Sequence, residues 1–323
     1  MTPARKNLLG LGAWALTVAL APHLLTNDYY VSTLIIGFFN AIIVVGLNLL
    51  LGYAGQISLG HGAFYGLAAY ASGILTATYG VPVELAALAA IALTGLVAWG
   101  IGIPTLKLSG HYLAMATLGF GVIVSIVFNE AVETTGGPSG LTGIPRLSLF
   151  GWSLDSDLSY YYVTGAALTL VMALSLTLIQ SRLGRALRAI HTSERAAEAV
   201  GVDIARYKLF VFVLSALFAA LAGVLYAHYL GFAAPSSFGF KFSVTLLVMV
   251  VLGGMASVWG AVAGALFLTA LPEFLRAFED IETLIFGAIL ILGMMFLPSG
   301  LAGGAARLSR RIRDALAGRP DRA

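Results

Sequence analysis

Long apolar runs separated by short polar connections fill most of the chain. A helix that crosses a bilayer needs about 20 predominantly apolar residues, and it satisfies its own backbone polar groups. Runs of this kind, bounded by charged residues, Gly or Pro, occur ten times. They predict spans at 8–25, 31–51, 57–79, 84–103, 110–129, 160–180, 209–230, 242–253, 258–276 and 281–298. The expected fold is therefore all-α, a polytopic transmembrane helix bundle of about ten spans that forms one domain over residues 1–323.

The eighth run, 242–253, is too short to cross a bilayer as a straight helix. The sequence predicts a broken or re-entrant helix here, joined to the ninth span through Gly253 and Gly254.

Glycines recur within the spans at a spacing that lets helix backbones approach closely. The pairs are Gly62 with Gly66 and Gly260 with Gly264. There is also a weak internal echo, because segments 51–56 and 252–257 both start with Leu-Gly and both precede a Gly/Ala-rich run. Internal repeats of this kind are common in transporter folds.

Charged residues distinguish the two sides of the membrane. The segment 181–208 and the basic tail 305–323 each hold six of the 18 Lys and Arg residues. The positive-inside rule places both in the cytoplasm, together with Arg5 and Lys6 near the start of the chain. The loop 130–159 carries four acidic residues against one arginine and is expected on the outer side. With ten spans, both termini are then cytoplasmic.

Composition excludes several classes of protein. Apolar types make up 59% of the residues and charged types 10%, which rules out a water-soluble enzyme with a polar surface and also a disordered chain. With no cysteine, disulfides, thiolate catalysis and Cys-based zinc sites are excluded. The net charge of +3 is concentrated beside apolar spans, so no nucleic-acid partner is expected.

The chain also lacks the motifs of the common membrane enzymes. It has no Gly-x-x-x-x-Gly-Lys run to bind ATP and no His-Glu-x-x-His pair to bind zinc. Acidic and basic groups lie at span ends, so no mid-membrane relay for a coupling proton or sodium ion is predicted. The sequence therefore predicts no enzyme, cofactor or metal in this chain, and energy for uphill transport would have to come from another chain.

Polar residues gather where the second predicted span passes into the third. Asn48, Gln56, Ser58 and His61 lie close together in the sequence, and buried polar groups in lipid must find partners. Two interpretations stay open: a hydrogen-bonded structural histidine, or a polar gate at the inner mouth of a solute pathway.

The cytoplasmic segment predicts a short helix with defined ends. Thr192 or Ser193 can cap its start, and Glu194 complements the positive end of the helix. Gly201 suits a left-handed C-terminal cap, and Asp203 can cap the next helix.

This helix has a small apolar face formed by Ala196, Ala197 and Val200, and arginines precede it. Such a face suits the groove of a partner protein, whereas the arginines would equally be attracted to anionic lipid.

At this segment the chain resembles a known family. Residues 195–201 read RAAEAVG and are similar to the coupling motif of ABC importer permeases, Glu-Ala-Ala-x-x-x-Gly, with Arg195 in the usual Glu position. Four further stretches resemble the branched-chain amino-acid ABC permease family of the LivM type. They are Gly46–Phe64, Pro104–Ala114, Thr135–Leu141 and Val250–Met255. The resemblance covers roughly residues 30–300.

The resemblance implies a permease subunit of an ABC importer in the bacterial inner membrane. A second, LivH-like permease subunit, two ABC ATPase subunits that bind the ATP, and a periplasmic substrate-binding protein would complete the machine. The residues implied to couple to the ATPase are Ser193, Glu194, Arg195, Ala196, Ala197, Glu198 and Gly201. The implied solutes are branched-chain amino acids. An importer of urea or short amides stays open, as does an ATP-independent channel or facilitator.

The outer loop contains one further candidate site. Thr135, Gly136, Gly137 and Gly140 either contribute to docking of the binding protein or form only a tight turn.

Overall fold

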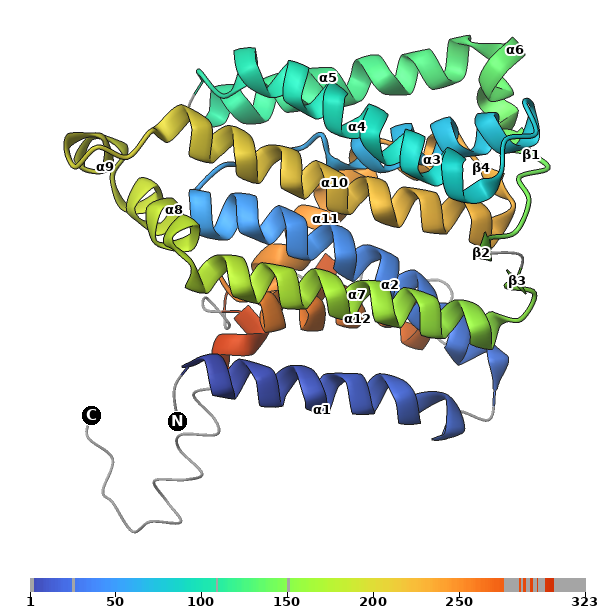
Figure 1. Cartoon of the computed structure of the whole chain (residues 1–323), viewed down its shortest axis with the longest axis horizontal. Helices are drawn as coiled ribbons and strands as arrows, with labels where there is room; N and C mark the ends of the chain where they lie inside the picture. The colour runs from blue at the N-terminus through green and yellow to red at the C-terminus, as the bar shows by residue number, and fades with distance from the viewer. Residues whose placement is uncertain are drawn as a thin grey trace.

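The computed structural model describes residues 3–24, 27–108, 110–149 and 152–275, with residues 285, 287, 288, 291, 292, 295 and 300–304. Long helices lie side by side and form a bundle (Figure 1). They are α1 (Pro3–Leu24), α2 (Asp28–Asn48), α3 (His61–Ala77), α4 (Val83–Thr105), α5 (His111–Glu130), α7 (Asp157–Gln180), α10 (Ile204–Leu230), α11 (Phe240–Gly253) and α12 (Val258–Leu275).

Shorter elements connect the long helices. A π-helical turn, η1 (Leu49–Tyr53), continues α2. The others are α6 (Val132–Thr135), η2 (Gly137–Ser139), α8 (Arg182–Thr192), α9 (Glu194–Ala199), η3 (Pro235–Phe238), β1 (Leu141–Thr142), β2 (Ser148–Leu149), β3 (Trp152–Ser153) and β4 (Phe232–Ala233). The strands form two antiparallel pairs, β1 with β4 and β2 with β3.

The all-α membrane bundle is confirmed, and each of the first nine predicted spans contains a helix. Within the described residues, seven helical stretches are long and apolar enough to cross a membrane. They are 29–53, 83–105, 111–130, 157–180, 204–230, 235–253 and 258–275. The tenth predicted span, 281–298, falls outside the described residues apart from isolated helical positions, and the tail 305–323 falls wholly outside them.

The helix formed by α2 and η1 occupies the centre of the bundle. It contacts α7, α10 and α12, and side chains such as Ile35, Phe39 and Ile42 are fully buried. Since lipid tails are as apolar as leucine, close packing rather than water exclusion holds such helices together. The predicted glycine pairs provide that packing. A Cβ on Gly66 would lie 2.7 Å from the ring of Phe238, and one on Gly264 would overlap the backbone of α11.

The helix after η1 begins later than expected. The third span was predicted from residue 57, but residues 55–60 are non-helical and α3 starts at His61. Gly55 has a φ of +68°, which turns the chain out of the preceding helix. The backbone N–H of Leu59 then donates to Thr117 Oγ1 (3.0 Å) instead of to a helical carbonyl.

The eighth predicted span, 242–253, lies within a longer helical stretch, 235–253, that is long and apolar enough to cross a membrane, so the prediction that it is too short to cross is not supported. The chain passes through the 3₁₀ turn η3 and Gly239, and it then runs through the 14 residues of α11. The helix ends at Gly254, whose φ is +122°, and α12 starts four residues later. The bundle therefore has two discontinuous helices, one at residues 55–60 and one at η3–α11.

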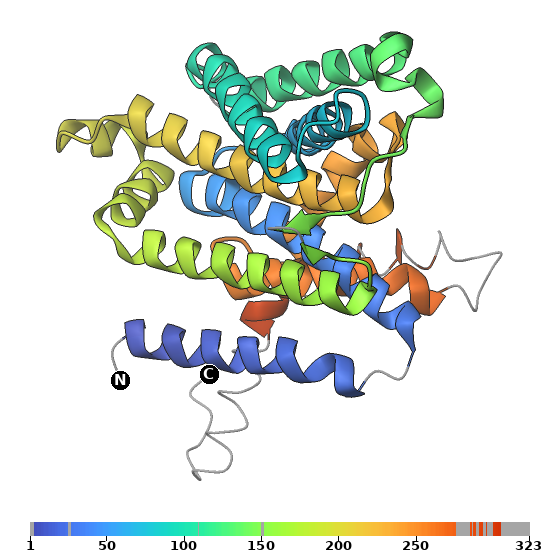
Figure 2. The same cartoon turned by 45° about the vertical axis from the view of Figure 1, so that its right-hand side comes forward.

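Two groups of connections mark the opposite ends of the bundle. Helices α8 and α9 protrude at one end, and α6 with the short strands lies at the other (Figures 1 and 2). The start of α1 lies at the α8–α9 end (Figure 1). The predicted opposition of the segment 181–208 to the loop 130–159 is thus present in the fold.

Candidate coupling helix and solute pathway

Local capping interactions define the short helix α9 as the sequence predicts. Ser193 is extended, and its Oγ accepts a hydrogen bond from the Ala196 N–H (3.3 Å). Gly201 adopts a φ of +83° after the helix. Asp203 Oδ1 accepts from the Arg206 N–H (3.1 Å) and caps α10. Because these caps are local, they need no tertiary contact to fix where the helix begins and ends.

One part of the predicted apolar face is wrong. Ala196 and Val200 are exposed, Val200 to 78%, but Ala197 is only 2% exposed. Its carbonyl accepts a hydrogen bond from the Val202 N–H (3.0 Å), in the turn that leads to α10. Ala197 therefore faces the chain itself. Ser193, Glu194, Arg195 and Glu198 are among the exposed residues around it.

An ion pair fastens α9 to α10. Lys208 Nζ lies 2.7 Å from Glu194 Oε1. The lysine side chain is 5% exposed and the glutamate side chain 46%. Sequence reasoning assigned Glu194 to the helix end and did not foresee this partner. The available signal was a lone lysine in the second turn of a long apolar helix, where a buried ammonium needs a counter-charge.

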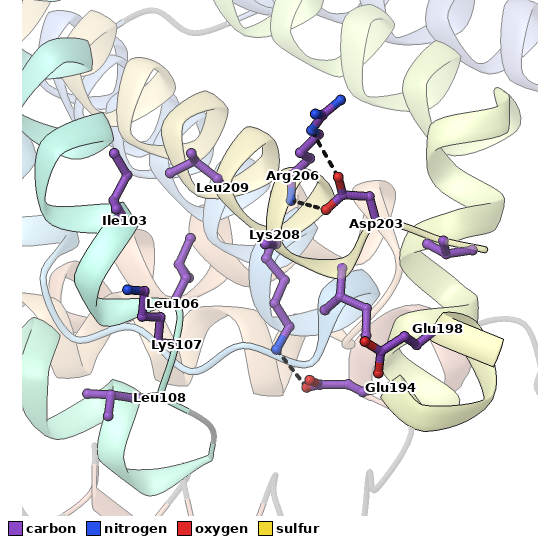
Figure 3. A pocket seen from close by; sticks show the side chains of 14 residues that line it. Ile103, Leu106, Lys107, Leu108, Glu194, Glu198, Asp203, Arg206, Lys208 and Leu209 are labelled. Atoms are coloured by element: carbon purple, nitrogen blue, oxygen red, sulfur yellow. Dashed lines mark hydrogen bonds and ion pairs between the residues drawn. The ribbon is translucent and has the colours of Figure 1, made fainter. Parts of the chain in front are cut away.

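The same residues border an open groove of about 610 Å³. One wall is the end of α4 with Leu106, Lys107 and Leu108, and the other is α9 with the first turns of α10. Figure 3 shows Glu194 and Glu198 on the α9 side, across the groove from Lys107 and Leu108. The groove combines an apolar floor with charged rims beside an exposed helix.

Both ring nitrogens of His61 are hydrogen-bonded. Ser215 Oγ donates to the Phe212 carbonyl (2.9 Å), so it accepts from His61 Nε2, 3.1 Å away. The other ring nitrogen, Nδ1, then accepts from Ser58 Oγ at 3.1 Å. The ring is 1% exposed. This network joins the start of α3 to α10.

Asn48 belongs to a second, separate network. Its Nδ2 donates to the Ser257 carbonyl (2.8 Å), and its Oδ1 accepts from the Ala256 N–H (2.9 Å). Tyr53 Oη donates to the Ala256 carbonyl (2.5 Å). The two segments of the internal echo, 51–56 and 252–257, are therefore in direct contact. A Cβ on Gly52 would overlap the Ala256 amide, which explains the glycine.

Gln56 differs from the other three polar candidates. It is 3% exposed, yet neither Nε2 nor Oε1 has a hydrogen-bond partner within the described part of the chain. Its backbone N–H donates to the Leu50 carbonyl (3.0 Å). The predicted polar cluster thus divides into two satisfied networks and one unpaired amide.

A small, partly open cavity of about 130 Å³ borders both discontinuous segments. It is lined by Leu59, by one face of α5, and by the start of α11 including Gly239 and Ser243. Ser243 Oγ accepts from the Gly62 N–H (3.1 Å), so the first turns of α3 and α11 meet beside the cavity.

The outer-loop candidates form a tight turn. Thr135 is 4% exposed, and its Oγ1 donates to the Phe128 carbonyl (2.8 Å) and accepts from the Gly137 N–H (3.2 Å). Gly136, Gly137 and Gly140 have φ values of +76°, +58° and +77°. Side chains at Gly136 and Gly140 would overlap backbone oxygens. These residues shape the loop, while neighbouring Pro138 and Ser139 are exposed.

Within the described ranges, no group of three or more His, Asp or Glu side chains is placed to hold a metal ion.

A bundle of apolar helices with two discontinuous members, a small cavity and an exposed capped helix at one end has the features of a multi-pass membrane transport protein. The comparison with known sequences defines the family. The family model for the permease component of the branched-chain amino acid transport system matches residues 29–295. The chain belongs to this family.

Individual relatives agree with this assignment. The high-affinity branched-chain amino acid transport system permease protein LivM of Salmonella typhimurium is 36% identical over 287 residues, which cover 80% of this chain and 67% of the relative. LivM of Escherichia coli is 35% identical over 283 residues, with the same coverage. The permease protein LivH of Salmonella typhimurium is 26% identical over 289 residues, 83% of this chain and 92% of LivH. No solved structure matches the chain.

Proposed function

We propose that the chain is the membrane-spanning permease subunit of an ABC importer for branched-chain amino acids. A periplasmic binding protein delivers the amino acid, and separate ATPase subunits provide the energy. The observation that carries this proposal is α9, an exposed helix with fixed ends that is attached to a long spanning helix by the Glu194–Lys208 pair.

The sidedness of the molecule supports the location of the ATPase. Six basic residues lie in the segment 181–208, and the positive-inside rule assigns such segments to the cytoplasm. The chain is then an inner-membrane protein with both termini in the cytoplasm. The ATPase docks on α9 through Ser193, Glu194, Arg195, Ala196, Glu198 and Val200, with Ala197 and Gly201 setting the shape of the helix.

The outer loop is the docking surface for the binding protein. Its buried turn, formed by Thr135, Gly136, Gly137 and Gly140, presents the exposed Pro138 and Ser139 together with Glu133. An ordered surface of this kind costs less entropy on association than a loose loop does.

The second, LivH-like permease subunit packs against α5. This helix is the least covered of the seven candidate spans, with 17% of its most apolar window buried against 89% for the central helix. Ile123 and Ile126 on α5 are 63% and 55% exposed, and they lie near the 130 Å³ cavity. Pairing on this face would place the solute pathway between the two subunits.

The test is uptake into proteoliposomes that contain the chain, its partner permease and the ATPases. Labelled leucine and urea are compared, with and without ATP and the matching binding protein. Leucine uptake that requires both ATP and the binding protein is the expected result. Urea uptake under the same requirements would retain the importer and replace the solute. Flux that does not depend on ATP would show that the protein is a channel and would overturn the coupling role of α9.

A further inference from the structure

The unpaired amide of Gln56 is a feature that neither the family nor the proposed transport function accounts for. We propose that Gln56 is a gating residue for the segment 55–60. Its amide lacks hydrogen bonds while this segment is closed over the cavity beside Leu59, and it gains them when the segment moves. This inference rests on the proposed function for its role in transport, but the movement itself can be measured separately.

The first step concerns burial. Gln56 is 3% exposed, and both polar atoms of its side chain are shielded from solvent and have no hydrogen-bond partner among the described residues. A buried amide without partners loses its hydrogen bonds to water and gains none in exchange, so it destabilises the conformation that buries it. The unpaired amide therefore shifts the balance away from the closed arrangement and towards any arrangement in which the amide has hydrogen bonds. An apolar residue at position 56 would not cause this shift.

The second step concerns position. At one end of the segment, a Cβ on Gly55 would lie 3.5 Å from Nδ1 of His191, at the end of α8. Two residues later, Ser193 begins the proposed coupling helix. At the other end of the segment, Leu59 lines the 130 Å³ cavity. Residues 55–59 therefore link His191, which lies just before the proposed coupling helix, to Leu59 in the wall of the cavity, the candidate solute pathway.

The third step concerns what holds the segment. Its two flanks are fixed, since Asn48 and Tyr53 bond to the turn after α11, and His61 bonds to α10. Between these anchors, four of the six backbone N–H groups of residues 55–60 donate a hydrogen bond to described residues. They are Gly55 N–H to the Leu51 carbonyl, Gln56 N–H to the Leu50 carbonyl, Leu59 N–H to Thr117 Oγ1 and Gly60 N–H to Ser58 Oγ. Non-helical backbone between fixed elements is where hinge motion needs the fewest bonds to break.

The experiment compares Gln56→Met, which keeps an unbranched side chain and removes the polar atoms, with Gln180→Met as the matched control. Gln180 is exposed at the end of α7, so that substitution strands no buried group. Because the chain has no cysteine, a single Ile57→Cys provides a clean site for a water-soluble maleimide. The labelling rate is measured on the assembled complex in membranes.

Removing an unpaired buried amide should favour the closed segment by about fivefold to a hundredfold. We expect Gln56→Met to raise the midpoint of thermal unfolding, to slow labelling at Ile57→Cys by at least fivefold, and to slow leucine uptake. Gln180→Met should leave all three unchanged. Gln56→Glu, which buries a charge, should shift the labelling rate in the opposite direction.

A lower thermal midpoint for Gln56→Met would show that the amide has a stabilising partner, such as a bound water, and would overturn the proposal. Labelling that responds to neither substitution at position 56 would also overturn it. If labelling responds as expected while the complex imports no amino acid, the gating role stands and the proposed solute fails.

Discussion

The ion pair between Glu194 and Lys208 offers the sharpest test of how α9 is attached to the bundle. Its two partners are unequal: the lysine side chain is 5% exposed and the glutamate side chain 46%. Glu194→Gln therefore leaves a buried ammonium without a counter-charge. Lys208→Met leaves only a carboxylate that water can reach, and methionine fills the space of the lysine stem.

The magnitudes follow from this asymmetry. Breaking a fully buried pair costs about 3–5 kcal/mol, and an exposed pair contributes about 0–1 kcal/mol. For a half-exposed glutamate we expect Glu194→Gln to weaken the attachment of α9 by about 1–3 kcal/mol, and Lys208→Met to weaken it by about 1 kcal/mol or less. The double substitution should recover most of the loss, which gives a coupling energy of about 1–2 kcal/mol.

Hydrogen exchange in the peptide that contains α9 measures the attachment directly, because local opening controls exchange in such elements. Uptake per ATP hydrolysed measures its consequence for coupling. Glu194→Gln should raise both the exchange rate of α9 and the ATP consumed per leucine. Equal effects of the two single substitutions, or a larger effect of Lys208→Met, would refute the view that a stranded buried lysine is the cause. If the double variant weakens the attachment of α9 by the sum of the two single effects, the direct pairing of Glu194 with Lys208 is refuted.

Three further outcomes follow from the geometry. Val200→Trp enlarges a side chain that is 78% exposed, so the chain should fold normally while co-purification with the ATPase is lost. His61→Ala removes a buried ring and both of its hydrogen bonds, and should destabilise the chain by about 2–4 kcal/mol, seen as a lower thermal midpoint that buffer pH does not restore. Gly66→Ala forces a Cβ to within 2.7 Å of Phe238 and should lower the free energy of unfolding by about 1–3 kcal/mol. The control Gly119→Ala, whose added Cβ would have no atom within 4 Å, should leave the thermal midpoint unchanged or slightly higher.

Features encoded by neighbouring residues could be predicted from the sequence. The apolar runs identified the helices because a span must satisfy its backbone within itself. The ends of α9 and the start of α10 were predictable from Ser193, Gly201 and Asp203, since each cap acts on residues two or three positions away. The end of α11 at Gly253 and Gly254 was predictable from these two glycines.

Features that depend on distant residues were not predictable. Ser215, which accepts from His61, is 154 positions away, and the residues bound by Asn48 are more than 200 positions away. The late start of α3 has the same origin. Ile57 and Leu59 are as apolar as the rest of the span, so the pattern predicts a helix, whereas in the structure the Leu59 N–H bonds to Thr117 on α5 instead of to a helical carbonyl. The burial of Ala197 likewise depends on how the chain turns towards α10.

The two networks and the unpaired amide together indicate where this bundle can change shape. Apolar side chains gain little by facing a helix rather than lipid, so hydrogen bonds and close contacts decide which helices move together. Asn48 and Tyr53 bind the end of the central helix to the turn between α11 and α12, and the His61 network binds α3 to α10. A displacement within either group would break buried bonds and cost free energy.

A displacement of residues 55–59 relative to both groups would break few bonds and would release the Gln56 amide from burial. If α9 moves with α10 through the Glu194–Lys208 pair, this segment is the place where that motion meets least resistance. Variants of Gln56 should therefore alter transport without altering ATPase docking, whereas variants of Val200 should lose ATPase docking and, with it, ATP-driven transport.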